Sequence, residues 1–234
     1  MRLLFIGNSF TYVNNLPLSF TRACQTAFMS PQISVAMSAR GGATLENHYK
    51  NAALSGILAE KNWDVVVLQE QSTRPLVMKS KFFRYAELLD GMIKKVGAQT
   101  CLYIPPVPKK ISSRQLKLNA VYLQCAQKLN ALVAPVGPAL YQIQADKPSI
   151  PVHHDDGIHP TPMASYIAAW VFYLTLFPDK HPLQFSREIY TTYYGTPHEG
   201  ATVRLPDISW GEAEYVYQAT KKSLDDFWVE NNSL

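Results

Sequence analysis

The segment Asp64 to Leu68 (DVVVL) constrains the fold of this chain more than any other stretch. A continuous β-branched and apolar run is typical of a strand that is covered on both faces, as in a parallel sheet. Four more short strands are expected over residues 2–6, 33–37, 100–104 and 132–136, and the residues of the segment 33–37 alternate in polarity. Apolar residues at helical spacing lie between them, in residues 16–29, 47–61, 80–96 and 112–131. This alternation predicts a three-layer α/β/α fold with a five-stranded parallel sheet.

The alternation of strands and helices ends near residue 138. A loop rich in proline, histidine and aspartate (residues 147–160) precedes an apolar helix, with Thr161 as the expected N-cap and Pro162 in its first turn. Residues 179–209 are expected to be irregular, and Ser209 is expected to cap a last helix. We expect one domain over residues 1–234, with a core of about residues 1–177 and residues 178–234 as an extension packed on it.

Composition excludes several classes of protein. With 47% hydrophobic and 17% charged residues, the chain is not disordered as a whole. The net charge of +4 is mild, and the densest basic group (residues 109–117) is expected to be a solvated surface, so neither nucleic acid nor a membrane is an expected partner. No apolar run reaches the ~18 residues of a membrane span. No signal-peptide pattern is visible, which favours a cytoplasmic location.

The three cysteines, Cys24, Cys101 and Cys125, do not form a metal or disulfide motif. Their number is odd, and no CxxC pair is present. Each lies in an apolar helical or strand pattern, so we expect three buried thiols.

Polar residues and glycines follow the first three predicted strands. These segments are Gly7-Asn8-Ser9, Arg40-Gly41-Gly42-Ala43-Thr44 and Gln69-Glu70-Gln71-Ser72. Parallel sheets bind ligands at the carboxyl ends of their strands, so all three segments are expected at one functional edge. A serine in such a place is often only a helix cap. The glycines allow a backbone N–H to approach a ligand, and a glutamine amide could stabilise an oxyanion.

Asp156 and His159 are three positions apart in the sequence, across Gly157, just before the capped helix. A short turn there can place the carboxylate beside the imidazole. A carboxylate on Nδ1–H fixes the histidine tautomer and lets Nε2 accept a proton from a hydroxyl. If the last helix brings this loop to the same edge as Ser9, His159 becomes the base that Ser9 needs.

In this order the motifs resemble those of the SGNH hydrolases, the GDSL-like lipases and esterases. That family has a serine in a G-x-S turn after the first strand, a glycine after the second, an asparagine after the third and a D-x-x-H motif near the end. The matching residues here are Ser9, Gly42, Asp156 and His159, and the resemblance covers roughly residues 2–177. Leu68 to Ser72 (LQEQS) replaces the usual G-x-N-D, which is similar to a divergent bacterial subfamily.

The resemblance implies a flavodoxin-like fold and a serine esterase without a cofactor. Ser9 would be the nucleophile, His159 the base and Asp156 its partner, acting on a small-molecule ester. The backbone N–H groups of Ser9 and Gly42 would form the oxyanion hole, with Gln71 or, alternatively, Gln69 as the third donor. Short-chain or acetyl esters, including those of carbohydrates, are the favoured substrates.

Two other functions remain open from the residues alone. Metal-assisted hydrolysis could use the cluster His153, His154, Asp155, Asp156 and His159, whose side chains are common metal ligands. The same fold could also be a binding module without catalytic activity.

Overall fold

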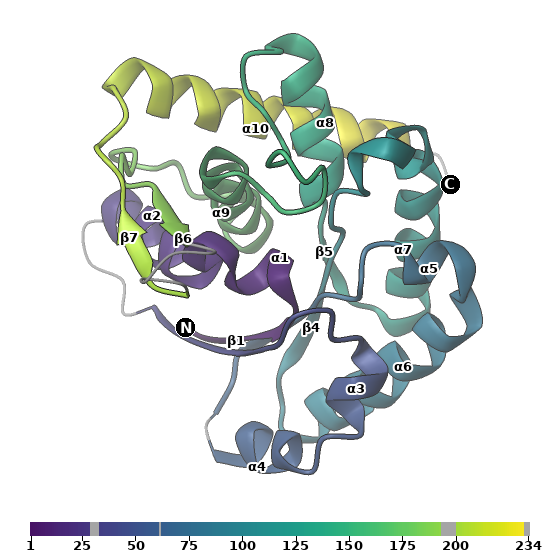
Figure 1. The fold of residues 1–234 in the computed structure, drawn as a ribbon. Coiled ribbons are helices and arrows are strands. Elements are labelled where there is room, and N and C mark those ends of the chain that lie inside the picture. Colours follow the sequence, from purple (N-terminus) through teal and green to yellow (C-terminus); the bar gives the residue numbers. More distant parts are fainter. Residues whose placement is uncertain (29–32, 61, 193–199, 232–234) are drawn as a thin grey trace. The chain divides into compact units, whose positions relative to one another are not determined.

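Five strands form one parallel sheet in the order β2-β1-β3-β4-β5 in the computed structural model (Figure 1). The structure describes residues 1–28, 33–60, 62–192 and 200–231. The strands are β1 (Arg2–Gly7), β2 (Ser34–Ala39), β3 (Val65–Leu68), β4 (Gln99–Tyr103) and β5 (Leu132–Ala134). This order is the flavodoxin-like one. The predicted α/β class and five-stranded parallel sheet are therefore confirmed.

Strand β3 is the middle strand of the sheet, with β1 on one side and β4 on the other. Leu4 and Phe5 of β1 are in register with Val66 and Val67 of β3. All four residues of β3 are buried, as the unbroken β-branched run predicts. The chain reverses its direction of winding between β1 and β3, and the crevice at such a switch point is where doubly wound sheets bind ligands.

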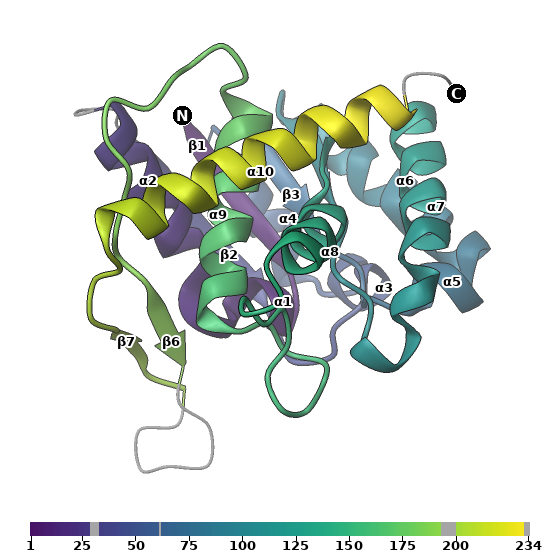
Figure 2. The ribbon, with the colours of Figure 1, turned by 90° about the horizontal axis from the view of Figure 1, so that it is seen from above.

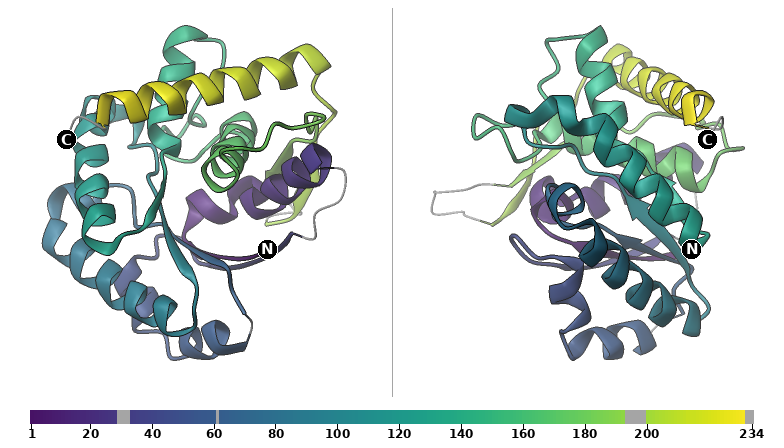
Figure 3. Two further views of the ribbon diagram at one scale, coloured as in Figure 1. Left: turned by 180° about the vertical axis from the view of Figure 1, so that it is seen from behind. Right: turned by 90° about the vertical axis from the view of Figure 1, so that its right-hand side faces the viewer.

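Residues Met1–Tyr12 and Ile33–Ala134 form one compact unit, which contains the sheet. Its helices are α1 (Ser9–Tyr12), α3 (Leu45–Tyr49), α4 (Ala53–Glu60), α5 (Arg74–Val77), α6 (Lys79–Lys95), η2 (Lys109–Arg114) and α7 (Gln115–Leu129). Helix α6 contacts β4, α7 contacts β5, and the two helices pack against each other (Figure 3).

Residues Val13–Gln32 and Pro135–Leu234 form a second compact unit. It contains η1 (Val13–Asn15), α2 (Leu16–Phe28), α8 (Val136–Asp146), α9 (Pro162–Leu176), β6 (Tyr190–Thr192), β7 (Thr202–Arg204) and α10 (Trp210–Asn231). Helix α9 packs against α2, α8 and α10, and Figure 2 shows α10 crossing over α9 and α8. Trp170 of α9 lies 5.2 Å from Tyr217 of α10, ring centre to ring centre, in an edge-to-face contact.

Several predicted elements have different boundaries in the structure. The helix expected over residues 47–61 is broken into α3 and α4, because the Asn51 carboxamide accepts a hydrogen bond from Ala53 N (3.1 Å) and starts a new helix. The strand expected over residues 132–136 ends at Ala134, and α8 begins at Val136. Pro138 lies in the first turn of α8, where the missing N–H removes no helical hydrogen bond.

The segment predicted as irregular, residues 179–209, contains a short antiparallel pair of strands. Tyr190 of β6 is in register with Arg204 of β7. Strands of three residues are too short to produce an alternating pattern that a sequence reader could recognise. Residues 193–199, and Met29 at the end of the predicted helix 16–29, lie outside the described residues.

The three cysteines are buried and free, as predicted. Burial raises the pKa of the Cys101 and Cys125 thiols to about 12. Within the described part of the chain, no helix combines the length and the apolar character that crossing a membrane requires.

Candidate active site

The turn after β1 presents Ser9 as the first residue of α1. Asn8 caps this helix: its carbonyl oxygen accepts hydrogen bonds from Thr11 N (2.9 Å) and Tyr12 N (3.2 Å), and its side-chain oxygen accepts one from Phe10 N (3.3 Å). Capping is therefore the task of Asn8 rather than of Ser9. The Ser9 hydroxyl stands at the carboxyl end of a central strand, next to the switch point between β1 and β3.

Gln69 holds the Ser9 turn from the end of β3. Its Oε1 accepts hydrogen bonds from Asn8 N (2.9 Å) and from the Thr11 hydroxyl (3.0 Å), while its Nε2 donates to Glu70 O (2.7 Å). A Cβ atom on Gly7 would lie 2.3 Å from Thr11 Oγ1 and 2.6 Å from Gln69 Oε1. The glycine before Asn8 is required because the Gln69 carboxamide occupies that space.

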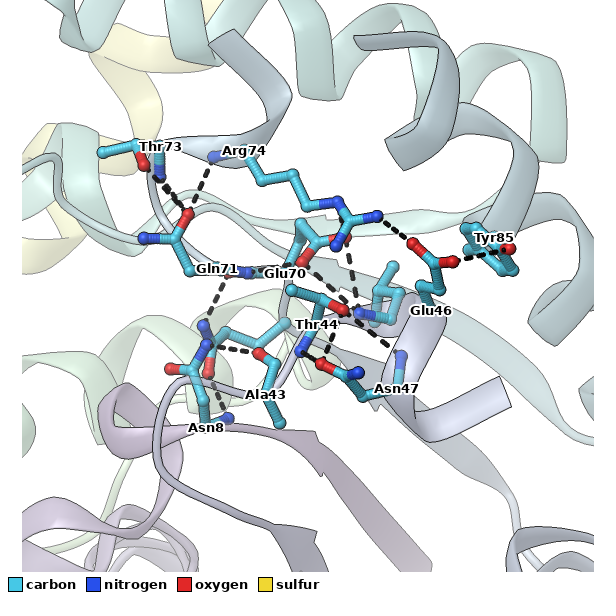
Figure 4. Close-up of polar contacts among 12 residues, drawn as sticks. Asn8, Ala43, Thr44, Glu46, Asn47, Glu70, Gln71, Thr73, Arg74 and Tyr85 are labelled. Atoms are coloured by element: carbon cyan, nitrogen blue, oxygen red, sulfur yellow. Dashed lines mark hydrogen bonds and ion pairs between the residues drawn. The ribbon is translucent and has the colours of Figure 1, made fainter. Parts of the chain in front are cut away.

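The loop after β2 is joined to the Ser9 turn by Asn8. Its Nδ2 donates to Ala43 O at 3.0 Å, as Figure 4 shows. The neighbouring Gly42 has a φ of 65°, in the left-handed region that favours glycine. Thr44 then caps α3 through a capping box with Asn47. Asn8 therefore fixes the position of the loop that carries Gly42.

Gln71 follows β3 with its carboxamide held in one orientation. Its Oε1 accepts hydrogen bonds from Thr73 N (3.0 Å), the Thr73 hydroxyl (2.9 Å) and Arg74 N (2.9 Å) (Figure 4). None of its hydrogen bonds within the described residues uses Nε2, the donor end of the group. A donor that is already oriented is what an oxyanion hole requires.

Asp156 and His159 meet in the loop before α9, as the spacing predicts. The loop is closed by a bridge between His153 and Pro160 and turns at Gly157, which has a φ of 67°. Asp156 Oδ2 lies 2.5 Å from His159 Nδ1, and Asp156 Oδ1 accepts hydrogen bonds from the backbone N–H groups of Ile158 (2.8 Å) and His159 (2.9 Å).

The environment of Asp156 keeps its carboxyl group ionised. Burial alone would raise its pKa, but the hydrogen bonds from the His159 ring and from two backbone N–H groups outweigh it, so that the pKa falls to about 2. An ionised carboxylate on Nδ1 of an imidazole stabilises the protonated ring and sets its orientation.

Asn14 anchors the chain that follows Ser9 to the His159 loop. It is buried, and its Nδ2 donates to Pro160 O (2.9 Å) and to Ser165 Oγ (2.9 Å). Its φ of 57° places it in the left-handed region, which asparagine adopts more readily than most residues. Sequence reasoning missed both Asn8 and Asn14. The Asn14-Asn15 pair before Leu16-Pro17 was a turn signal, whereas nothing in the sequence indicated the partners of Asn8.

The five side chains of the metal hypothesis do not assemble into a binding site. Among the described residues, no group of three or more His, Cys, Asp or Glu side chains is arranged to hold a metal ion. The hypothesis of metal-assisted hydrolysis therefore gains no support from the geometry.

The fold and these loops define a class of protein. It is a flavodoxin-like α/β protein with a serine at the β1/β3 switch point, together with a paired aspartate and histidine in a loop before a late helix.

Comparison with known proteins shows which solved structures this chain is similar to. No protein-family model matches the sequence, and no curated protein is significantly similar to it. Among solved structures, a candidate SGNH hydrolase from Slackia heliotrinireducens is 28% identical, with a TM-score of 0.66 over 75% of this chain and 98% of that one. A catalytic mutant of Axe2, an acetylxylan esterase from Geobacillus stearothermophilus, is 17% identical, with a TM-score of 0.59 over 75% and 93% of the two chains. The esterase EstA from Pseudoalteromonas sp. is 16% identical, with a TM-score of 0.55 over 76% and 97%.

The chain belongs to the SGNH hydrolase superfamily.

Proposed function

We propose that the protein is a serine esterase that hydrolyses carboxylic esters through an acyl-enzyme on Ser9. The observation that carries this proposal is the contact of 2.5 Å between Asp156 Oδ2 and His159 Nδ1. A histidine held in this way is a general base for a hydroxyl nucleophile, and Ser9 is the hydroxyl at the ligand-binding edge of the sheet.

The path of the chain supports a shared role for Ser9 and His159. Asn14 follows Ser9 by five residues and hydrogen-bonds to Pro160, the residue after His159. Five residues span at most about 18 Å even when fully extended. The short chain from Ser9 to Asn14 and the hydrogen bond from Asn14 to Pro160 therefore together limit how far Ser9 can lie from His159.

In the proposed mechanism, His159 Nε2 takes the proton of the Ser9 hydroxyl while Ser9 Oγ attacks the ester carbonyl carbon. The tetrahedral intermediate collapses when protonated His159 gives its proton to the leaving alkoxide. His159 then takes a proton from a water molecule as this water attacks the acyl carbon, and gives the proton to Ser9 Oγ as the bond between the acyl carbon and Ser9 Oγ breaks, which releases the acid and restores the free enzyme. Asp156 stays ionised throughout and stabilises the imidazolium.

The negative oxygen of the intermediate would be bound by three donors: the backbone N–H groups of Ser9 and Gly42, and Nε2 of Gln71. Gln71 is a better candidate than Gln69, because the Gln69 carboxamide already holds the Ser9 turn. We propose acetyl or other short-chain esters as substrates, including acetylated carbohydrates. The structural similarity to Axe2 supports this substrate class.

Labelling by a fluorophosphonate, together with hydrolysis of p-nitrophenyl acetate, tests the proposal. Ser9→Ala should abolish labelling and lower kcat/KM by at least ~10⁴-fold, and His159→Ala should cause a similar loss in hydrolysis. Ser55→Ala is a matched control, because this serine on α4 is exposed and its hydroxyl donates to Ala52 O (3.0 Å), away from the proposed site. Full activity in Ser9→Ala, or labelling at another residue, would overturn the mechanism. Acetylated sugars and p-nitrophenyl esters of increasing chain length would define the substrate.

A further inference from the structure

A network of charged side chains lies beside the proposed oxyanion loops without belonging to the catalytic residues (Figure 4). Its centre is Glu70, whose side chain is fully buried. Arg74 lies between two carboxylates: its Nε is 3.9 Å from Glu70 Oε2, and its Nη2 donates to Glu46. Glu46 also accepts hydrogen bonds from the Tyr85 hydroxyl (3.0 Å) and from Lys50 Nζ (2.6 Å).

The Glu70 carboxylate connects two different loops. It accepts a hydrogen bond from its neighbour Gln71 N at 2.7 Å, and from Leu45 N at 3.3 and 3.4 Å to its two oxygens. Leu45 is the first residue of α3, three positions after Gly42. One buried side chain therefore sets the spacing between the loop of Gly42 and the loop of Gln71.

Arg74 contacts both ends of this arrangement. Its guanidinium forms an ion pair with Glu70 (Nε to Oε2 3.9 Å), while its backbone N–H donates to Gln71 Oε1 at 2.9 Å. The same residue thus supports the carboxylate and orients the carboxamide. A buried carboxylate is costly unless it is paired and hydrogen-bonded, so a chain that needed only structural support could use an apolar residue here at less cost.

We propose that Glu70, supported by Arg74 and Glu46, is a positioning residue that holds the Gly42 N–H and the Gln71 carboxamide in the geometry of the oxyanion hole. This inference rests on the proposed esterase function. It assigns the middle residue of LQEQS a role toward the transition state, and Glu70 itself touches no substrate.

A double-mutant cycle at pH 8 tests this role. Glu70→Gln should lower kcat for p-nitrophenyl acetate about 10- to 100-fold with KM changed less than threefold, because the donors act in the transition state. If Glu70 acts through Gln71, the combined loss in Glu70→Gln/Gln71→Ala should be smaller than the product of the two single losses. Glu87→Gln is a matched control, since Glu87 forms an exposed ion pair with Lys128 (2.7 Å) and should leave kcat unchanged.

Losses that multiply in the double mutant, or a change in KM alone, would overturn the positioning role while leaving the esterase proposal intact. Should Glu70→Gln fail to fold, Glu46→Gln provides the same test from the partly exposed end of the network, with a smaller fall in kcat expected.

Hydrogen exchange tests the network independently of activity. The amides of Leu45 and Gln71 should exchange faster in Glu70→Gln than in Glu87→Gln, because they lose a charged acceptor. Unchanged exchange would overturn the inference even in a protein that hydrolyses no ester. A wild type without esterase activity, combined with the expected exchange, would refute the proposed function and with it the oxyanion role, and would leave only the finding that Glu70 holds the Leu45 and Gln71 amides.

Discussion

The Ser9 turn requires a residue without a side chain at Gly7. Gly7→Ala would place a methyl group 2.3 Å from Thr11 Oγ1 and 2.6 Å from Gln69 Oε1. We expect a loss of about 1–3 kcal/mol in the free energy of unfolding, and a lower kcat because the turn must shift. Gly56→Ala is the control: its Cβ would meet nothing within 4 Å, and the change should stabilise α4 by about 0.5–1 kcal/mol. Denaturant titration of both variants compares them, and equal effects would contradict the steric argument.

The two glutamines of LQEQS should respond differently to truncation. Gln71→Ala removes the proposed donor and should lower kcat ~10²- to 10³-fold. Gln69→Ala removes the acceptor of Asn8 N and of the Thr11 hydroxyl, so it should also lower the free energy of unfolding, by about 1–3 kcal/mol. Measuring kcat and denaturant midpoints together separates the roles. A Gln71→Ala enzyme with wild-type kcat would remove this residue from the oxyanion hole.

Among the elements, the sequence predicted the strands best, since a β-branched run such as Val65–Leu68 has few alternatives to a buried strand. It also predicted the pairing of Asp156 with His159, because that contact is local. It could not predict that Gln69 holds Asn8, because the two residues are 61 positions apart and meet only when β1 and β3 pair. The helix α8 was missed because Pro135 at its N-cap and Pro138 in its first turn, in isolation, indicate a break.

Helix α9 begins at a cap that also supports the His159 loop. Thr161 Oγ1 accepts a hydrogen bond from Ala164 N (3.1 Å) and donates one to Pro151 O (2.6 Å). Its backbone N–H donates to Val152 O at 3.1 Å. The residue that starts the helix thus ties together the two ends of the loop that carries Asp156 and His159.

Alanine substitutions at the N-caps of α9 and α10 test whether the hydrogen bonds of Thr161 to the His159 loop matter for activity. Thr161→Ala should cost about 1 kcal/mol of stability and also lower kcat several-fold, because the His159 loop loosens. Ser209→Ala removes the cap of α10, where Ser209 and Glu212 form a reciprocal pair, and should cost a similar amount of stability without lowering kcat. Thermal unfolding and initial rates on p-nitrophenyl acetate give both quantities. An equal loss of activity in the two variants would show that the cap acts only through stability.

At the scale of the whole molecule, the two compact units alternate along the chain. The chain passes between them after Tyr12, after Gln32 and after Ala134. A regular strand–helix alternation in the sequence does not reveal this division, since α2 stands between β1 and β2 in the chain but is grouped with α8, α9 and α10. The expected core of residues 1–177 with an extension of residues 178–234 stays a prediction.

The stability of the whole molecule should depend on pH through Glu70. Burial raises its pKa from 4.5 to about 7, despite the opposing hydrogen bond from Gln71 N and the charge of Arg74. Between these values the folded state binds a proton that the unfolded state has released, so the free energy of unfolding should fall as pH rises from 4.5 to 7 and level off above. The pKa of Asp156 is lowered instead. The contribution of Asp156 to the free energy of unfolding is therefore present above pH 4 and is lost as the pH falls toward 2.

Glu70→Gln removes the first of these two effects and retains the second. The wild type should therefore lose stability relative to Glu70→Gln between pH 5 and pH 8. We expect this relative loss in the free energy of unfolding to be up to about 3 kcal/mol. Urea titrations of both proteins at the two pH values measure this shift, with Glu87→Gln as the reference for an exposed carboxylate. A difference that is the same at pH 5 and pH 8 would mean that Glu70 keeps an ordinary pKa, and that Arg74 compensates fully for its burial.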